Sequence, residues 1–218
     1  MGGELQRVLV ATAVEAERDA VLRGLRGDGR FDVRAVGVGP AAAAAGTAAI
    51  LAAGGYGLVV SAGIGGGFAD RAAVGSLVVA SEIVAADLGA ETADGFASVD
   101  ELGFGSARVP ADAARASRAA RALAEAGLAV AFGPVLTVST ATGTAATALA
   151  RAARVPGAAA EGMEGYGVAV AARNRGLPVL EIRAVSNAVG PRDRSAWRIG
   201  EALAALEAAS AILLEVLP

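Results

Sequence analysis

Four short segments of the 218-residue sequence carry polar or glycine residues whose types and spacing could form a catalytic site. They are Val14–Glu17 (VEAE), Ala62–Phe68 (AGIGGGF), Glu161–Ala169 (EGMEGYGVA) and Glu181–Trp197 (EIRAVSNAVGPRDRSAW). The chain has no His and no Cys, which excludes a cysteine or serine–histidine nucleophile and the usual His/Cys zinc site. Acid–base chemistry must therefore fall to Asp, Glu, Tyr or a bound group, and we expect no metal and no cofactor.

The first segment places Glu15 and Glu17 just after an apolar run that is typical of a buried strand. Acids in the first turn of a helix stabilise it by about 0.3–1 kcal/mol each through the helix dipole, and this role needs no catalytic function. At the carboxyl end of a strand, one of the two acids could instead be a general base that activates water.

The second segment is rich in glycine and follows another buried strand. Glycine lets a backbone approach a ligand closely, so this segment could be a ligand-facing loop, with a tight turn as the alternative. A dinucleotide-binding fingerprint is disfavoured, because that motif lies in the first strand–helix unit and precedes a helix. Here the segment follows the third predicted strand and precedes a fourth.

In the third segment, Met163 and Glu164 stand between two glycines. A carboxylate beside an apolar thioether suits a sugar, because the acid can accept hydrogen bonds from two adjacent hydroxyls while the thioether packs on the carbon face. The alternative is a Met in the core and an acid at the start of a helix.

The fourth segment ends a predicted strand on Ser186 and Asn187. An Asn side chain offers a donor and an acceptor side by side, which can bind the edge of a heterocyclic base; closing a turn is the alternative. Earlier in the same strand, Arg183 could orient a water molecule or form a buried ion pair with Glu181, which shares its strand face.

Apolar strand-like runs alternate with Ala-rich helical stretches along the whole chain. The predicted strands are 7–13, 31–38, 57–61, 76–86, 129–138 and 178–186, and the predicted helices are 16–25, 41–53, 111–126, 166–175 and 198–217. This alternation predicts an α/β fold with a largely parallel sheet, whose ligands bind at the carboxyl ends of the strands. Residues 89–105 are expected to form an irregular loop.

Composition limits the functional classes. The chain is 55% hydrophobic and 19% charged, which predicts one globular domain over residues 1–218. A net charge of -3 with scattered Arg residues gives no basic surface for nucleic acid. Because we find no membrane span and no signal peptide, we expect a cytoplasmic protein with no membrane partner.

Taken together and in order, VEAE, SAGIGGGF, GMEG and RAVSN resemble the purine nucleoside phosphorylase and nucleosidase superfamily over nearly the whole chain. The resemblance implies a three-layer α/β/α fold around a mixed sheet, and cleavage of a purine N-ribosidic bond by water. It also implies a small-molecule nucleoside as substrate and a homodimer or larger homo-oligomer.

The resemblance assigns roles to particular residues. Glu17 matches the Glu that activates water, and Met163 and Glu164 match the residues that hold the ribose. Arg183 joins the expected catalytic residues. Arg192 or Arg194 could bind a substrate carboxylate; the alternatives are that they cap the closing loop over the base or form a solvated charged turn. The other substrate-binding residues that we expect are Gly63, Ile64, Gly65, Gly66 and Ser186.

Asn187 falls where the 5′-methylthioadenosine nucleosidases of this superfamily carry an Asp that protonates the base. Because Asn can donate to the carbonyl of a 6-oxopurine and accept from its ring N–H, it predicts hypoxanthine as the leaving base. The first loop has no glycine, and Glu17 would repel phosphate, so we expect hydrolysis. The alternatives are a 5′-methylthioadenosine/S-adenosylhomocysteine nucleosidase, a nucleoside phosphorylase, and a nucleoside-binding module without catalysis.

Overall fold

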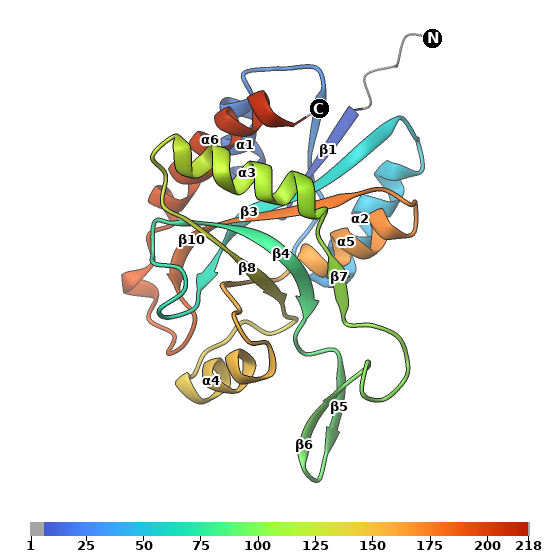
Figure 1. Cartoon of the computed structure of the whole chain (residues 1–218), viewed down its shortest axis with the longest axis vertical. Coiled ribbons are helices and arrows are strands. Elements are labelled where there is room, and N and C mark those ends of the chain that lie inside the picture. Colours follow the sequence, from blue (N-terminus) through green and yellow to red (C-terminus); the bar gives the residue numbers. More distant parts are fainter. Residues whose placement is uncertain (1–6, 218) are drawn as a thin grey trace.

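The computed structural model describes residues 7–217, in which a mixed β-sheet is covered by helices on both sides (Figure 1). The strands are β1 (Arg7–Thr12), β2 (Phe31–Ala35), β3 (Tyr56–Gly67), β4 (Leu77–Ala85), β5 (Gly89–Thr92), β6 (Gly95–Ser98), β7 (Arg108–Pro110), β8 (Val130–Thr137), β9 (Ala160–Gly162) and β10 (Val179–Ala188). The helices are α1 (Glu15–Leu25), α2 (Pro40–Leu51), α3 (Ala113–Glu125), α4 (Ala145–Arg154), α5 (Gly165–Arg173) and α6 (Ile199–Val216), with a 3-10 turn, η1 (Arg194–Ala196).

The main sheet has the strand order β10-β4-β8-β9-β3-β1-β2, with β7 attached to β4. Five of its strand pairings are parallel and three are antiparallel. The prediction of an α/β fold with a mixed, largely parallel sheet is therefore confirmed. Because β10 also pairs with β3, the strands β3, β9, β8, β4 and β10 close into a ring, which the sequence did not predict.

The two layers of helices follow from the way in which the side chains of β1 are buried on both faces of the sheet. Its residues Val8 and Val10 belong to the core beneath α1, α3 and α6, whereas Leu9 and Ala11 belong to the core beneath α2 and α5. Successive side chains of a strand point to opposite faces, so an unbroken apolar run such as RVLVAT requires cover on both sides. Figure 1 shows these two groups of helices on either side of the sheet.

Two predicted loops are regular structure. The glycine segment is not a loop, because β3 continues through Gly67, where Gly66 pairs with Glu161 of β9 and Asn187 of β10. Pairing on both edges overrides the low strand propensity of glycine. Residues 89–105 likewise contain the hairpin β5–β6, which projects from the body of the protein (Figure 1).

Besides the hairpin β5–β6, two more strands and a helix were missing from the sequence interpretation. The helix α4 and the short strands β7 and β9 lie in segments to which no element was assigned. The two strands have only 3 residues each, too few to show a period. The strand β9 matters most, because it places Glu161 and Gly162 beside the glycine end of β3.

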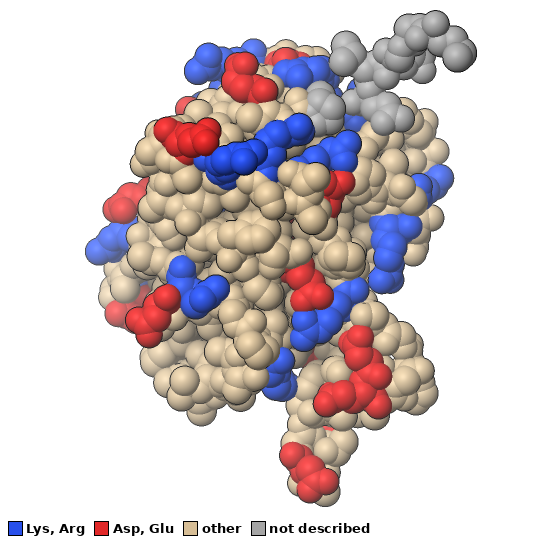
Figure 2. All heavy atoms as spheres, viewed as in Figure 1, with Lys and Arg blue, Asp and Glu red and all other residues tan. Residues whose placement is uncertain are grey.

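The visible surface carries basic and acidic side chains interspersed, without one continuous basic area (Figure 2). Acidic residues on and after the β5–β6 hairpin include Glu91, Asp94, Asp100 and Glu101. Within residues 7–217, no helix is long and apolar enough to cross a membrane.

Helix α3 offers a test of local stability. Asp112 caps it by accepting a hydrogen bond of 2.9 Å from the backbone N–H of Arg115, and this bond, with the Arg115 guanidinium, lowers the pKa of Asp112. We expect Asp112→Ala to lower the free energy of unfolding by about 1 kcal/mol at neutral pH. An acid whose pKa is lower in the folded than in the unfolded state stabilises the fold at pH values above its unfolded pKa. The stability lost in Asp112→Ala should therefore disappear as the pH falls through the folded pKa of Asp112.

Urea unfolding of Asp112→Ala and the wild type over a pH series measures this loss. Thr144, which caps α4 by accepting from the N–H of Thr147, is the matched control. Thr144→Ala should give a loss that does not change with pH, because its hydroxyl does not titrate. A loss for Asp112→Ala that is equally large in acid would contradict a role for its charge.

Candidate active site

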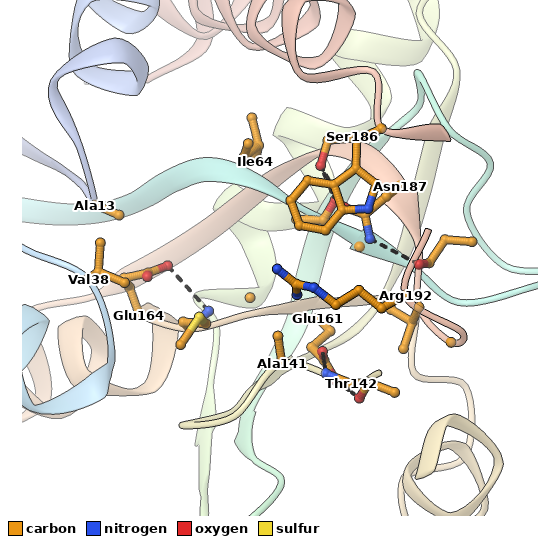
Figure 3. A pocket seen from close by; sticks show the side chains of 18 of the residues that line it. Ala13, Val38, Ile64, Ala141, Thr142, Glu161, Glu164, Ser186, Asn187 and Arg192 are labelled. Carbon is orange, nitrogen blue, oxygen red and sulfur yellow. Dashed lines mark hydrogen bonds between the residues drawn. The ribbon is translucent and has the colours of Figure 1, made fainter. Parts of the chain in front are cut away.

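A cavity of about 280 Å³ opens where β1, β3 and β10 end, next to the N-termini of α1 and α5 (Figure 3). The predicted residues that line it are Glu17, Ile64, Gly65, Gly66, Met163, Glu164, Ser186, Asn187 and Arg192. Gly63, Arg183 and Arg194 do not line it. The structure therefore brings together residues from segments up to 175 positions apart in the sequence, counted from Glu17 to Arg192.

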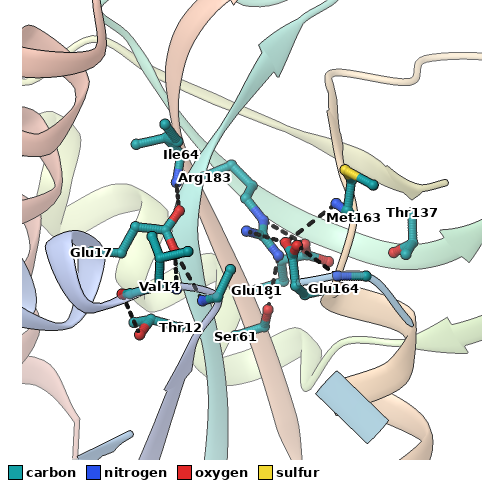
Figure 4. A network of polar contacts seen from close by, with 12 residues as sticks. Thr12, Val14, Glu17, Ser61, Ile64, Thr137, Met163, Glu164, Glu181 and Arg183 are labelled. Atoms are coloured by element: carbon teal, nitrogen blue, oxygen red, sulfur yellow. Dashed lines mark hydrogen bonds and ion pairs between the residues drawn. The ribbon is translucent and has the colours of Figure 1, made fainter. Parts of the chain in front are cut away.

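Glu17 lies at one side of this cavity and is 4% exposed. One carboxylate oxygen accepts the N–H of Ala13 at 2.8 Å and of Val14 at 3.3 Å, and the other accepts the N–H of Ile64 at 2.9 Å (Figure 4). A carboxylate has about four acceptor positions, so one is left for a water molecule in the cavity. The neighbouring Glu15 is exposed and pairs with Arg18, and has only the helix-terminal role.

Glu164 lies across the cavity at the start of α5 and is 6% exposed. It accepts the N–H of Gly39 at 3.2 Å and of Met163 at 3.3 Å, and it pairs with Arg183 at 3.3 Å. Met163 is half-buried beside it and also lines the cavity. A fixed carboxylate next to a thioether is the arrangement expected for holding a sugar through its hydroxyls.

Arg183 lies beneath the cavity and is 1% exposed. Its Nε donates to Glu181 at 2.8 Å, its Nη1 reaches Glu164, and its Nη2 donates to Ser61 at 3.0 Å (Figure 4). The buried ion pair with Glu181 is confirmed. Arg183 does not line the cavity, but it contacts Glu164, which does.

Charge balance explains how this group stays buried. Desolvation lowers the pKa of Arg183, but the charges of Glu181, Glu164 and Glu17 outweigh it, so the pKa of Arg183 is raised and the group stays cationic. Desolvation raises the pKa of Glu181, which is 0% exposed, against the opposing charge of Arg183. One oxygen of Glu181 has no hydrogen-bond partner among residues 7–217.

The position of Gly63 in β3 leaves no room for a side chain. A Cβ atom at Gly63 would lie 2.6 Å from Oε1 of Glu17 and 2.7 Å from Nη1 of Arg183. A side chain there would push the acid and the guanidinium apart. Gly63 therefore contributes by permitting close approach, although it does not itself line the cavity.

Ser186 and Asn187 lie on one side of the cavity, away from Glu164 and Val38 (Figure 3). The Ser186 hydroxyl lies 2.8 Å from Oδ1 of Asn187, and Nδ2 of Asn187 donates to the carbonyl of Ala188 at 2.9 Å. These contacts orient the amide and leave one N–H and one acceptor position for a ligand.

The two loop arginines differ in position. Arg192 extends into the cavity, with its guanidinium 5.1 Å from the centre of the Trp197 ring (Figure 3). No carboxylate in the described part of the chain lies within ion-pair distance of it. Arg194 lies in the exposed turn η1, outside the cavity lining, which agrees with the alternative of a solvated charge.

Several lining residues were not assigned from the sequence. Thr142, Glu161 and Trp197 line the cavity and carry polar groups, and Val38 adds an apolar edge that is 55% exposed. Glu161 was visible as the first acid of its motif, but nothing in the sequence pairs it with Thr142, which is 19 residues away. Residues 7–217 contain no group of three or more Asp, Glu, His or Cys side chains that could hold a metal.

Comparison with known proteins agrees with this geometry. A model of the phosphorylase superfamily matches residues 16–217. Futalosine hydrolase of Streptomyces coelicolor is 56% identical, over 96% of this chain and 96% of the relative. The structures of Helicobacter pylori futalosine hydrolase (16% identity, TM-score 0.82) and Neisseria meningitidis 5′-methylthioadenosine/S-adenosylhomocysteine nucleosidase (23% identity, TM-score 0.80) each cover 97% of this chain, and this chain covers 98% of each.

The closed mixed sheet and the two carboxylates at its carboxyl edge define a nucleoside-cleaving protein of the phosphorylase superfamily, as the motifs predicted. Within that superfamily, the chain belongs to the futalosine hydrolase family. The prediction of a nucleosidase is confirmed at the level of the family. The alternative, a 5′-methylthioadenosine/S-adenosylhomocysteine nucleosidase, is supported by likeness of fold alone.

Proposed function

We propose that this chain hydrolyses the N-ribosidic bond of futalosine, releasing hypoxanthine and dehypoxanthine futalosine in menaquinone biosynthesis. The observation that carries the proposal is the position of Glu17. Its carboxylate is held by three backbone N–H groups and lines a cavity that Glu164 and Asn187 also line. Family membership supports the choice of substrate.

In the proposed mechanism, Glu164 accepts hydrogen bonds from the ribose hydroxyls, and Met163 packs on the carbon face of the sugar. Asn187 donates to the 6-oxo group and accepts from the N–H that forms at N7 as the base leaves, with that proton supplied by water. The bond to the base therefore loosens first and leaves an oxocarbenium-like sugar. Glu17 then takes a proton from the attacking water. Arg183 positions Glu164 from below.

Water is favoured over phosphate as the attacking group because of the carboxylates in the cavity. A phosphate in this cavity would face the carboxylates of Glu17 and Glu164, and the buried Arg183 that pairs with Glu164 is already shared with Glu181. Arg192, whose guanidinium lies in the cavity, is assigned below to the carboxylate of the substrate. The loop from Ala11 to Val14 has no glycine that would bring further backbone N–H groups to a phosphate.

The test is incubation with futalosine or methylthioadenosine, with and without phosphate, followed by chromatography of the released bases. We expect hypoxanthine from futalosine, at a rate that phosphate does not change. Adenine release from methylthioadenosine at a matching rate would overturn the substrate, and phosphate-dependent ribose 1-phosphate would overturn hydrolysis. No release of either base would favour a binding module.

Arg192 is the residue that we propose for the carboxylate of futalosine. Its guanidinium lies in the cavity without a carboxylate partner, and Arg194 does not reach it. We expect Arg192→Ala to raise KM for futalosine about 10- to 100-fold, as for loss of a charge-assisted hydrogen bond, with a smaller change in kcat.

Two controls make this test specific. Arg194→Ala should behave like the wild type, because Arg194 lies outside the cavity. Inosine, which has no carboxylate, should be cleaved equally well by the wild type and Arg192→Ala. An equal loss with inosine would show that Arg192 shapes the loop instead of binding the carboxylate.

We further propose that the protein works in the cytoplasm as a homodimer or larger homo-oligomer. The superfamily resemblance supports this, as does Phe104, which is 83% exposed after the projecting hairpin. Light scattering after size-exclusion chromatography, together with cell fractionation, tests both points. A monomer at working concentration would contradict the first.

A further inference from the structure

A third carboxylate that lines the cavity has no role in the mechanism above. Glu161 lies on β9, lines the cavity and is 7% exposed. It accepts the N–H of Thr142 at 2.7 Å, the hydroxyl of Thr142 at 2.5 Å and Nη1 of Arg151 at 2.8 Å. Arg151 is itself 6% exposed, so this is a buried ion pair at the cavity wall and not a surface charge.

The sheet register places Glu161 opposite Asn187. Gly66 of β3 pairs with Glu161 on one side and with Asn187 on the other. Paired residues on adjacent strands point to the same face, and two strand spacings separate their Cα atoms by about 10 Å. Gly66 between them has no side chain, and a Cβ atom there would lie 2.8 Å from Val189 and 3.2 Å from Asn187. The Val189 side chain fills the space beside Gly66, and both residues line the cavity. A flat ring that packs on Val189 would therefore lie between the amide of Asn187 and the carboxylate of Glu161.

The available atoms suit a 6-oxopurine. Three of about four acceptor positions of the Glu161 carboxylate are used, which leaves one for a donor in the cavity. A 6-oxopurine carries a hydrogen on N1 next to its carbonyl, whereas the N1 of a 6-aminopurine is a bare acceptor. A carboxylate binds the first and repels the second, because it has no hydrogen to donate.

We infer that Glu161 accepts the N1–H of the leaving base and, with Asn187 on the N7 and 6-oxo edge, sets the preference for hypoxanthine over adenine. Arg151 and Thr142 act as positioning residues that hold the carboxylate. The inference rests on the proposed function, since it assumes that a 6-oxopurine is released. It assigns base selection to a residue pair and not to Asn187 alone.

The test is Glu161→Gln with futalosine and with the same nucleoside carrying adenine in place of hypoxanthine. The amide of Gln can donate to the bare N1 of adenine. We expect the ratio of kcat/KM for the 6-oxo and 6-amino substrates to fall about 10- to 100-fold, the value of one hydrogen bond to a charged group. A role in folding or in holding the loop would lower both values equally and leave the ratio unchanged, and that result would overturn the inference.

Thr142→Val is the matched control. It removes one hydroxyl contact but keeps the carboxylate, so the ratio should stay near that of the wild type even if both rates fall. A fall in the ratio as large as that for Glu161→Gln would assign the discrimination to the loop of Thr142, against the inference.

Binding of free bases gives a readout that does not need a folded variant. By calorimetry, the wild type should bind hypoxanthine but bind 1-methylhypoxanthine, which has no N1–H, at least about 10-fold more weakly. Equal binding of the two bases would overturn the inference. If the wild type shows this base preference yet releases nothing from futalosine, the base site stands and the proposed function fails.

Discussion

Glu17→Gln is expected to lower kcat for hypoxanthine release from futalosine by about 10²- to 10⁴-fold, the usual contribution of a general base. The substitution keeps the size of the side chain but removes its ability to take a proton from water. It also places an amide N–H₂ against backbone donors, since the wild-type carboxylate accepts from Ala13, Val14 and Ile64. Chromatography of the hypoxanthine released at saturating futalosine measures the loss of kcat.

Glu15→Gln is the control for this experiment. Glu15 is an acid two residues earlier in the same helix turn, but it is exposed and pairs only with Arg18. It should keep wild-type activity. KM for futalosine should change little in Glu17→Gln, because Glu164 and Asn187 still bind the substrate. A Glu17→Gln variant that is folded and retains more than about a tenth of wild-type kcat would disprove the proposed base.

Arg183→Met is expected to lower the free energy of unfolding by about 3–5 kcal/mol, the cost of removing one partner from a buried ion pair. The change leaves Glu181, which is 0% exposed, and Glu164, which is 6% exposed, without their shared cation. Urea unfolding measures the loss. We also expect activity to fall, because the Glu164 carboxylate loses the contact that positions it.

The double variant Arg183→Met/Glu181→Leu separates charge from packing. It removes the buried acid together with its partner, so it should be more stable than Arg183→Met alone. Arg23→Met is the surface control, since Arg23 forms an exposed pair with Glu207 at 2.7 Å and should contribute less than about 1 kcal/mol. A double variant no more stable than Arg183→Met would mean that the loss comes from packing.

The stability lost in Arg183→Met should also depend on pH, and the pKa of Glu181 decides whether the loss grows or shrinks as the pH rises. Burial raises the pKa of Glu181, and removal of Arg183 takes away the charge that opposes this shift. An acid whose folded pKa is raised stabilises the fold when protonated, and that contribution is lost as the pH rises through the folded pKa. The loss in Arg183→Met should therefore grow from acid to neutral pH.

Much of the fold could be predicted from local patterns. The apolar run of β1 required cover on both faces, and the Ala-rich stretches had helical spacing, so the α/β class followed from periodicity. The glycine end of β3 could not be recognised as a strand, because β9 and β10 hold it in the sheet by pairing from distant segments. The pairing of β10 with β3, which closes the ring of strands, could not be predicted for the same reason.

The sequence by itself determined which side chains could do the chemistry. Without His or Cys, the acids of VEAE and GMEG and the amide of Asn187 were the available groups, and their order along the chain indicated the superfamily. Each residue, however, had an ordinary structural interpretation of its own. Glu15 and Glu17, for example, are equivalent as acids in one helix turn.

Only the tertiary structure decided between such interpretations. It buries Glu17 and exposes Glu15, and it places Arg183 beneath the cavity and Arg192 within it. It also brings Glu161 into register with Asn187 across Gly66. Burial and register depend on strand pairing between segments far apart in the chain, whereas composition and spacing describe only neighbours in sequence.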